Sequence, residues 1–285
     1  MHSELGLARR ALLADGIAAL TAAGLDGAGR EALRLWAELF DEAPGAALLD
    51  PEHPIASETA AVYLSAVRRR AAGEPLAHVT GVAGFRHLTL RSDRRALIPR
   101  PETEGLVGLV LACVPRGRVA DVGTGSGCIA LSLATEGAYD EVVGIDLSLD
   151  ALRLAAENRR STGGRVSLVQ GNLCDALRPD SLDALVSNPP YLTAEEYAGL
   201  DLSVRDWEPE LALAGGSDGL DVIARLLDTG VAVVRPGGWL ALEIDCARAA
   251  LCARRAGAAG WTDVAIHADL FGRERYLLAR RSDAP

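Results

Sequence analysis

VADVGTGSG, at Val119–Gly127, is the stretch that decides the fold of this 285-residue chain. Its apolar first half predicts a strand, and Ile129–Leu131 shortly after the last glycine predict a helix. Glycines in a turn from strand to helix let the backbone approach a ligand closely, because no Cβ stands in the way. An open α/β sheet binds its ligands at such turns, so this stretch predicts a ligand site.

Further strands follow this turn along the chain. The sequence predicts seven strands, at 119–122, 141–146, 165–170, 184–187, 239–244, 263–267 and 275–279, with helices after most of them. Strands that alternate with helices form a mainly parallel sheet that is covered on both faces. The sequence therefore predicts an α/β, Rossmann-like fold for this part of the chain.

The residues before this region show a helical pattern instead. Apolar side chains such as Leu33, Trp36 and Phe40 lie at helical spacing, and three or four helices are predicted up to about residue 72. Residues 78–95 predict a hairpin, and residues 103–113 predict a helix. We therefore expect a helical N-terminal domain at 1–75, a linker hairpin at 76–96 and a Rossmann-like domain at 97–285.

Composition narrows the class of protein. A formal net charge of −10 disfavours a broad nucleic-acid surface, although a local basic groove stays open. The five cysteines show no paired spacing, so neither a disulfide framework nor a metal site is predicted. Residues 1–20 lack the long apolar core of a signal peptide, and no stretch is apolar for long enough to span a bilayer. We expect a cytoplasmic enzyme, without membrane or nucleic-acid partners, that is a monomer.

Three segments predict contacts with a nucleoside, namely the glycine turn, the end of the second predicted strand at Asp146, and residues 170–173 after the third. Asp146 ends the second strand, where its carboxylate can accept hydrogen bonds from both ribose hydroxyls. Cys128 stands where a dinucleotide fingerprint has its third glycine, so the turn is a poorer match to NAD. The alternative is that Asp121 and Asp146 merely cap helices. The predicted cofactor-binding residues are Gly123, Thr124, Gly125, Ser126, Gly127, Asp146, Asn172, Leu173 and Asn188.

Asn188-Pro189-Pro190-Tyr191 is the motif that indicates the chemistry. Two prolines stiffen the backbone, so the Pro189 carbonyl and the Asn188 side-chain oxygen can present two fixed acceptors to an NH₂ group. These acceptors raise the electron density on a planar amide or aromatic amine, and the Tyr191 ring can stack on that group. The motif predicts transfer of a sulfonium methyl group to nitrogen, unless it is an ordinary turn.

With these residues in place, the chain resembles the class I S-adenosylmethionine methyltransferases, and specifically the HemK/PrmC family of protein-(glutamine-N5) methyltransferases that modify peptide chain release factors. The resemblance covers nearly the whole chain. Five motifs carry it, namely Gly73–Gly81, Leu97–Glu104, Asp121–Gly127, Asn188–Tyr191 and Val204–Pro209.

This resemblance implies S-adenosyl-L-methionine as cofactor and the glutamine of a Gly-Gly-Gln motif in release factors as methyl acceptor, a role in translation termination. It also implies that the helical N-terminal domain helps to hold the release factor, that Asn188 contacts both cofactor and substrate, and that Pro189, Pro190 and Tyr191 clamp the glutamine. The turn at 98–104 is expected to line the same pocket. Asn172 and Asp245 depart from the family's usual aspartate and glycine.

Three other functions stay open on the sequence. A DNA adenine-N6 methyltransferase needs the same amine clamp, with the base flipped out of the duplex. A sister enzyme that methylates glutamine in a ribosomal protein is a closer alternative, although the motif at 98–104 favours the release-factor branch. A catalytically silent binding protein would keep the fold without turnover.

Overall fold

A computed structural model describes residues 7–43 and 45–283 of the chain. The described contacts divide it into two compact units, Met1–Val82 with Leu202–Trp207, and Ala83–Asp201 with Glu208–Pro285. The domain boundaries expected from the sequence, at 75/76 and 96/97, stay a prediction.

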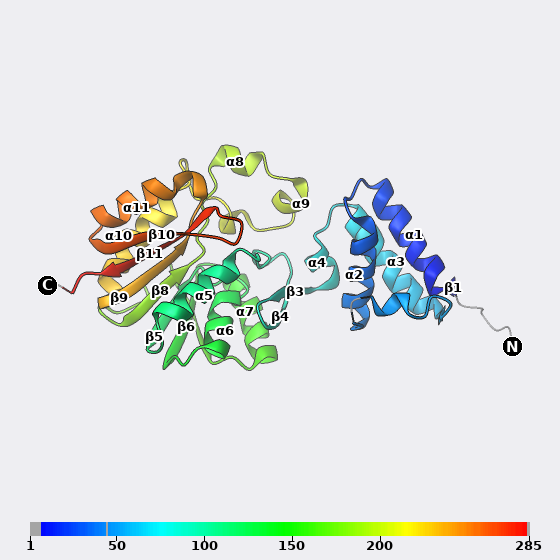
Figure 1. The fold of residues 1–285 in the computed structure, drawn as a ribbon, viewed down its shortest axis with the longest axis horizontal. Coiled ribbons are helices and arrows are strands. Elements are labelled where there is room, and N and C mark those ends of the chain that lie inside the picture. The colour runs from blue at the N-terminus through cyan, green and yellow to red at the C-terminus, as the bar shows by residue number, and fades with distance from the viewer. Residues whose placement is uncertain (1–6, 44, 284–285) are drawn as a thin grey trace. The chain divides into compact units, whose positions relative to one another are not determined.

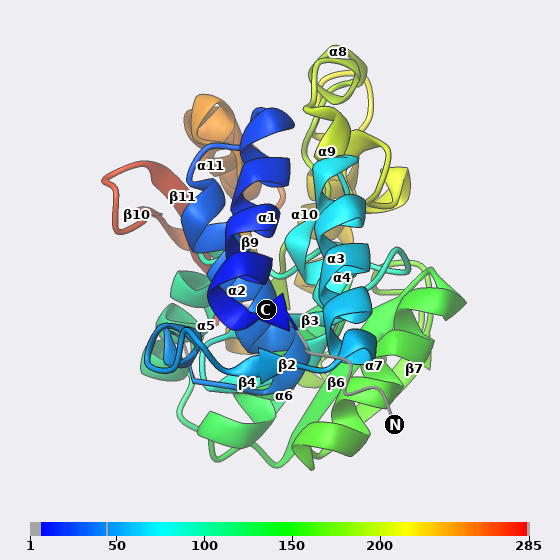
Figure 2. The same cartoon turned by 90° about the vertical axis from the view of Figure 1, so that its right-hand side faces the viewer.

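The first unit is helical. It contains α1 (Arg9–Ala22), α2 (Ala28–Phe40), α3 (Ser57–Ala71), α4 (Leu76–Thr80) and the short α9 (Leu202–Arg205), with a 3-10 turn at Ala46–Leu48 and a small antiparallel pair, β1 (Leu7–Ala8) and β2 (Pro54–Ile55). Helices α1, α2 and α3 each pack against the other two (Figure 2). Trp36 and Tyr63 are buried at the centre of their core, with ring centroids 5.3 Å apart.

The predicted hairpin is shorter than expected. It consists of β3 (Val82–Phe85) and β4 (Leu88–Arg91), whereas Val79 and Thr80, which the sequence placed in it, belong to α4. The extended backbone of Pro75 precedes this helix, and Gly81 ends it with a φ of 79°. These two residues outweigh the preference of Val79 and Thr80 for strands, because proline suits a helix start and glycine suits a left-handed end.

The second unit is built on a seven-stranded sheet, as predicted (Figure 1). The strand order is β10-β11-β9-β8-β5-β6-β7. Strand β11 pairs antiparallel with both of its neighbours, and the other four pairs are parallel. The strands are β5 (Arg118–Val122), β6 (Glu141–Asp146), β7 (Val166–Gln170), β8 (Leu182–Ser187), β9 (Val234–Glu243), β10 (Trp261–Ala268) and β11 (Glu274–Arg281).

One strand starts earlier than the sequence predicts. The prediction began it at Trp239, after Pro236 and two glycines, but β9 begins at Val234. Its pairing with β8 shifts register between Val234 and Trp239, so the proline and glycines occupy an irregular part of the strand. Proline and glycine within a strand are tolerated at such irregularities.

Helices cover both faces of the sheet (Figure 1). On one face lie α5 (Thr103–Cys113), α6 (Cys128–Glu136) and α7 (Leu149–Thr162), and on the other lie α10 (Asp221–Val233) and α11 (Ala249–Ala258). Neighbouring strand residues point to opposite faces, so Val119 packs toward α5 and α6 while Ala120 packs toward α10. The remaining short elements are α8 (Ala194–Ala198) and 3-10 turns at Glu210–Ala212 and Cys246–Arg248.

Two further features of the described residues concern the cysteine thiols and the apolar character of the helices. All five cysteines are free; Cys174 and Cys252 are buried and Cys246 is exposed. Within residues 7–43 and 45–283, none of the helices combines the length and apolar character that crossing a bilayer requires.

Candidate functional site

A cavity of about 250 Å³ opens at the carboxyl ends of β5, β6 and β8. The strand order reverses beside β5, because β6 lies on one side of it and β8, which comes later in the chain, lies on the other. Open α/β sheets bind ligands at such a reversal. Nine of the predicted site residues line this cavity, namely Gly123, Thr124, Gly125, Ser126, Asp146, Asn172, Leu173, Asn188 and Pro190.

The glycine turn passes from β5 into α6 along the cavity wall. The backbone N–H groups of Gly123 and Thr124 donate to the Ile145 carbonyl at 2.8 and 2.9 Å, which fastens the turn to the end of β6. Gly123 and Gly125 have φ of 75° and 55°, a left-handed conformation that disfavours residues with a Cβ. Gly127 does not line the cavity, and its role in the turn is to start α6.

Asp146 lies beside this turn at the end of β6. Its two carboxylate oxygens accept from the N–H groups of Gly125 and Ser148, both at 2.8 Å. Burial raises the pKa of Asp146, and these backbone donors counteract the rise. A carboxylate has about four acceptor positions, so the group retains capacity for ligand hydroxyls.

Asp121 is fully buried behind the turn and does not line the cavity. One of its oxygens accepts from the Thr124 hydroxyl at 2.7 Å and from the Ala130 N–H at 3.1 Å. The alternative reading from the sequence, that this acid supports the start of a helix, matches these contacts. Burial raises the pKa of Asp121 to about 7, and the hydrogen bonds from Thr124 and Ala130 offset part of the rise.

Asp121→Asn should change how stability depends on pH. The pKa of Asp121 is about 7 in the folded chain and roughly 3.9 for an unfolded aspartate, so the folded state holds the extra proton between these values. Its contribution to the free energy of unfolding is therefore largest below about pH 4 and falls as the pH rises toward 7. The asparagine variant cannot lose a proton and should gain stability relative to the parent from pH 5 to 8. Urea unfolding at several pH values measures this, and parallel pH curves would contradict it.

The turn at Leu97–Glu104 forms another wall of the cavity. The lining residues from this segment are Leu97, Ile98, Pro99, Arg100 and Thr103, in line with the expectation for the turn at 98–104. Glu208, whose side chain is 1% exposed, accepts from the Ile98 N–H at 2.9 Å and from the Arg100 guanidinium at 2.6 Å. Glu208 belongs to the Val204–Pro209 motif, but the sequence alone predicts no role for it. Its carboxylate fixes the shape of this wall.

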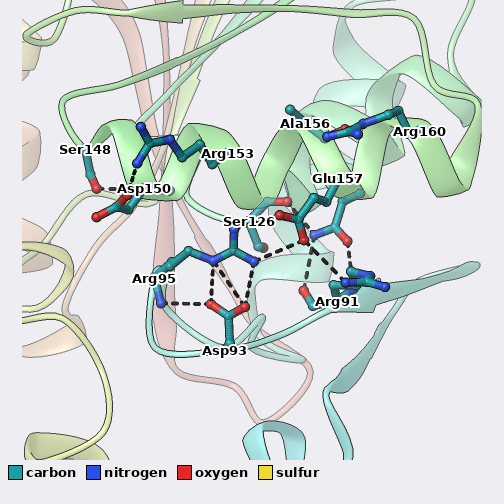
Figure 3. A network of polar contacts seen from close by, with 12 residues as sticks. Arg91, Asp93, Arg95, Ser126, Ser148, Asp150, Arg153, Ala156, Glu157 and Arg160 are labelled. Atoms are coloured by element: carbon teal, nitrogen blue, oxygen red, sulfur yellow. Dashed lines mark hydrogen bonds and ion pairs between the residues drawn. The ribbon is translucent and has the colours of Figure 1, made fainter.

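Arg95 extends the wall toward α7 through a network of charged groups (Figure 3). Its guanidinium pairs with Asp93 at 2.7 Å and with Glu157 at 2.8 Å. Beneath it, the fully buried amide of Asn158 donates to the Ser126 carbonyl at 2.9 Å, and so connects the glycine turn with α7. The Asn158 bond thereby supports the backbone of Ser126, which lines the cavity.

The Asn188–Tyr191 motif follows β8 directly. Asn188 and Pro190 line the cavity, whereas Pro189 and Tyr191 do not. Asn188 is anchored by its Nδ2, which donates to the Thr103 hydroxyl at 3.1 Å. Burial raises the pKa of Tyr191 to about 12, so this side chain stays a neutral phenol. The roles predicted for Pro189 and Tyr191 stay predictions.

A glycine-rich segment for which the sequence predicted no role lies close against the motif. The Gly215 N–H donates to the Leu192 carbonyl at 2.8 Å, and the Leu192 N–H donates to the Leu213 carbonyl at 3.0 Å. A Cβ on Gly215 would stand 2.6 Å from the Pro190 carbonyl oxygen. Only glycine allows this close approach of two backbones. The feature of the sequence that could have indicated the contact is the Gly215-Gly216 pair.

Gly215→Ala should displace the Asn188–Tyr191 motif. Its Cβ would meet backbone atoms of both Pro190 and Tyr191 at under 3.0 Å, so the loop has to shift. A misplacement of about 1 Å can cost roughly 100-fold in rate, and we expect a loss of tenfold to 100-fold in turnover. The matched control is Gly257→Ala in α11, where a Cβ meets nothing within 4 Å. Equal turnover of the two variants would contradict this role of Gly215.

Of the two departures from the family pattern, Asp245 is accommodated by its local contacts. Asp245 has an ordinary extended backbone, with φ of −72°, and its side chain caps the following 3-10 turn by accepting from the Ala247 N–H at 3.0 Å. It also pairs with Arg248. Asn172 lines the cavity next to Leu173, whose φ of 54° is left-handed.

Family models match two regions of the chain. The model described as "Methyltransferase small domain" matches residues 106–201, which include the glycine turn and the Asn188–Tyr191 motif. The model described as "PrmC N-terminal domain" matches residues 11–81. Just over half of the residues that line the cavity therefore lie within the region matched by the methyltransferase model.

Known proteins resemble most of the chain. A release factor glutamine methyltransferase of Cereibacter sphaeroides is 41% identical over 92% of this chain and 94% of its own length. That of Deinococcus radiodurans is 41% identical over 96% of this chain and 98% of its own length. A methyltransferase structure from Pyrococcus furiosus, at 19% identity and a TM-score of 0.52, covers 68% of this chain and 88% of its own and shares the fold. The chain belongs to the release factor glutamine methyltransferase family.

Proposed function

We propose that this enzyme transfers a methyl group from S-adenosyl-L-methionine to the side-chain amide nitrogen, N5, of the glutamine in the Gly-Gly-Gln motif of peptide chain release factors. One observation carries the proposal: in a chain 41% identical to release factor glutamine methyltransferases, Asn188 and the glycine turn line one cavity. The place of action would be the cytoplasm, and the protein would act as a monomer.

The cavity suits a nucleoside cofactor. Glycines at Gly123 and Gly125 leave room for close approach, and Asp146 offers acceptors for ribose hydroxyls. Asn172 and Leu173 would contact the adenine. S-adenosyl-L-methionine would supply an electrophilic methyl group on a sulfonium, which leaves as a neutral thioether.

The acceptor nitrogen needs activation and alignment. An amide nitrogen is a weak nucleophile, because its lone pair is delocalised into the carbonyl. The Asn188 side-chain oxygen and the Pro189 carbonyl would accept its two hydrogens, and Tyr191 would stack on the amide plane. Holding the nitrogen in line with the methyl group is worth up to about 7–11 kcal/mol. When the nitrogen takes the methyl group it loses one proton to solvent, so the products are a neutral N-methyl amide, a neutral thioether and a released proton.

The helical N-terminal region would hold the release factor. It matches the N-terminal model of the same family, and its residues 11–81 lie outside the methyltransferase model. A protein substrate presents a larger surface than a single glutamine, so a separate recognition region is expected.

The test is transfer of a labelled methyl group from S-adenosyl-L-methionine to a purified release factor. A copy with the Gly-Gly-Gln glutamine changed to alanine, a ribosomal protein fraction and duplex DNA serve as parallel acceptors. Label on the intact release factor alone supports the proposal. Label on the alanine copy as well, or on DNA or ribosomal protein instead, would overturn the assigned acceptor.

A further inference from the structure

Three polar side chains from distant parts of the second unit form a series of hydrogen bonds that begins in the cavity wall and ends at Glu243. Asn188 Nδ2 donates to Thr103 Oγ1 at 3.1 Å, and Thr103 Oγ1 donates to Glu243 Oε2 at 2.7 Å. Thr103 begins α5, Asn188 follows β8 and Glu243 ends β9. Thr103 and Glu243 are 2% and 1% exposed, so water does not compete for these bonds.

The direction of donation along these hydrogen bonds decides whether the oxygen or the nitrogen of the Asn188 amide faces the cavity. The oxygen and nitrogen of an amide are nearly the same size, so the network of hydrogen bonds, rather than shape, sets its orientation. A threonine hydroxyl has one proton to donate. When Glu243 is ionised it only accepts, so the Thr103 proton goes to Glu243 and Thr103 can only accept from Asn188.

We infer that Thr103 and Glu243 are positioning residues that turn the Asn188 side-chain oxygen toward the methyl-accepting nitrogen. The inference rests on the proposed function, in which that oxygen accepts from the substrate NH₂ group. With the amide turned the other way, an NH₂ donor of Asn188 would face an NH₂ donor of the substrate. Glu243 does not line the cavity, so it acts through Thr103 and Asn188.

Protonation of Glu243 would remove the constraint that fixes the orientation of the Asn188 side-chain amide. A protonated carboxyl can donate to Thr103, whose own proton then becomes free for the Asn188 oxygen. Burial raises the pKa of Glu243 to about 7, while the hydrogen bond from Thr103 and the nearby Arg275 lower it. The ionisable groups that interact with Glu243 are Arg100, Glu102, Cys128, Tyr191, Arg275 and Tyr276.

Thr103→Val tests the inference by removing the hydroxyl from a side chain of the same shape. We expect turnover to fall roughly tenfold to 100-fold, because the amide loses its fixed orientation. The dissociation constant for S-adenosyl-L-methionine should change less than about twofold. Thr103→Ser keeps the hydroxyl and should restore most of the turnover. Loss of turnover in both variants to the same degree would overturn the inference, as would full turnover in Thr103→Val.

The pH profile provides a second test, which a purely structural role would not affect. Turnover of the parent should decline as the pH falls through about 7, because Glu243 takes up its proton there. Glu243→Gln cannot titrate, so this decline should disappear from its profile whatever its level of activity. An unchanged decline in a folded Glu243→Gln protein would contradict the inference.

A third measurement does not depend on turnover and therefore separates this inference from the proposed function. Side-chain amide NMR signals of Asn188 should shift with the same midpoint as the Glu243 carboxyl in the parent, and should lose that dependence in Thr103→Val. Failure of the parent to methylate a release factor would reject the proposed function alone. Asn188 signals that stay constant through the Glu243 titration would reject the orientation mechanism alone.

Discussion

Asn188→Ala should abolish methyl transfer to the release factor while the protein stays folded and binds S-adenosyl-L-methionine. The substitution removes one of the two acceptors proposed for the substrate nitrogen. Loss of a single fixed polar group at a reacting centre typically costs about 10²–10³ in turnover. Steady-state kinetics, thermal unfolding and cofactor titration measure the three properties. Normal turnover in this variant would reject the proposed mechanism.

Asn172→Ala is the matched control for this experiment. It makes the same chemical change in the same cavity, but at a residue proposed to contact adenine rather than the substrate nitrogen. It should raise the KM for the cofactor and leave turnover at saturation largely unchanged, the signature of lost ground-state binding. Tyr191→Ala should lower turnover less than Asn188→Ala, since it removes stacking and leaves both acceptors. The same kinetic change in Asn172→Ala and Asn188→Ala would mean that the two asparagines share one role.

Most of the fold could be predicted because its signals are local. Alternating strands and helices, together with the glycine turn, predicted the seven strands and the helix at Thr103–Cys113. The cavity residues that were predicted also follow strands directly, where a parallel sheet gathers its ligands. Val79 and Thr80 were placed wrongly, because their preference for strands competes with the helix signals of Pro75 and Gly81.

The supporting contacts could not be predicted, because they join residues that are far apart in the chain. Glu208 lies 110 positions from Ile98, and Glu243 lies 140 positions from Thr103. No periodic pattern connects such pairs, and each depends on how the ends of neighbouring strands and loops meet. The close approach of Gly215 to Pro190 is of the same kind. Residues that line the cavity were therefore easier to predict than those that hold them in place.

Asp146→Ala should weaken the binding of S-adenosyl-L-methionine without a comparable loss of turnover at saturation. The carboxylate is proposed to accept both ribose hydroxyls, and each hydrogen bond to a charged group is worth about 1.5–3 kcal/mol. Two such bonds correspond to at least roughly 100-fold in the dissociation constant, because about 1.4 kcal/mol is tenfold. Ribose is remote from the reacting atoms, so the loss should appear in binding rather than in the chemical step.

Asp150→Ala provides the control for charge. Asp150 lies four residues away on α7, its side chain is 63% exposed and it pairs with Arg153 at the surface at 2.8 Å. Exposed ion pairs contribute little, so this variant should bind cofactor like the parent. Asp146→Asn keeps one acceptor oxygen but loses the charge, and should fall between the two. Isothermal titration calorimetry orders the three variants. Equal affinities of Asp146→Ala and Asp150→Ala would show that Asp146 only supports the Gly125 turn, to whose N–H it is already bonded.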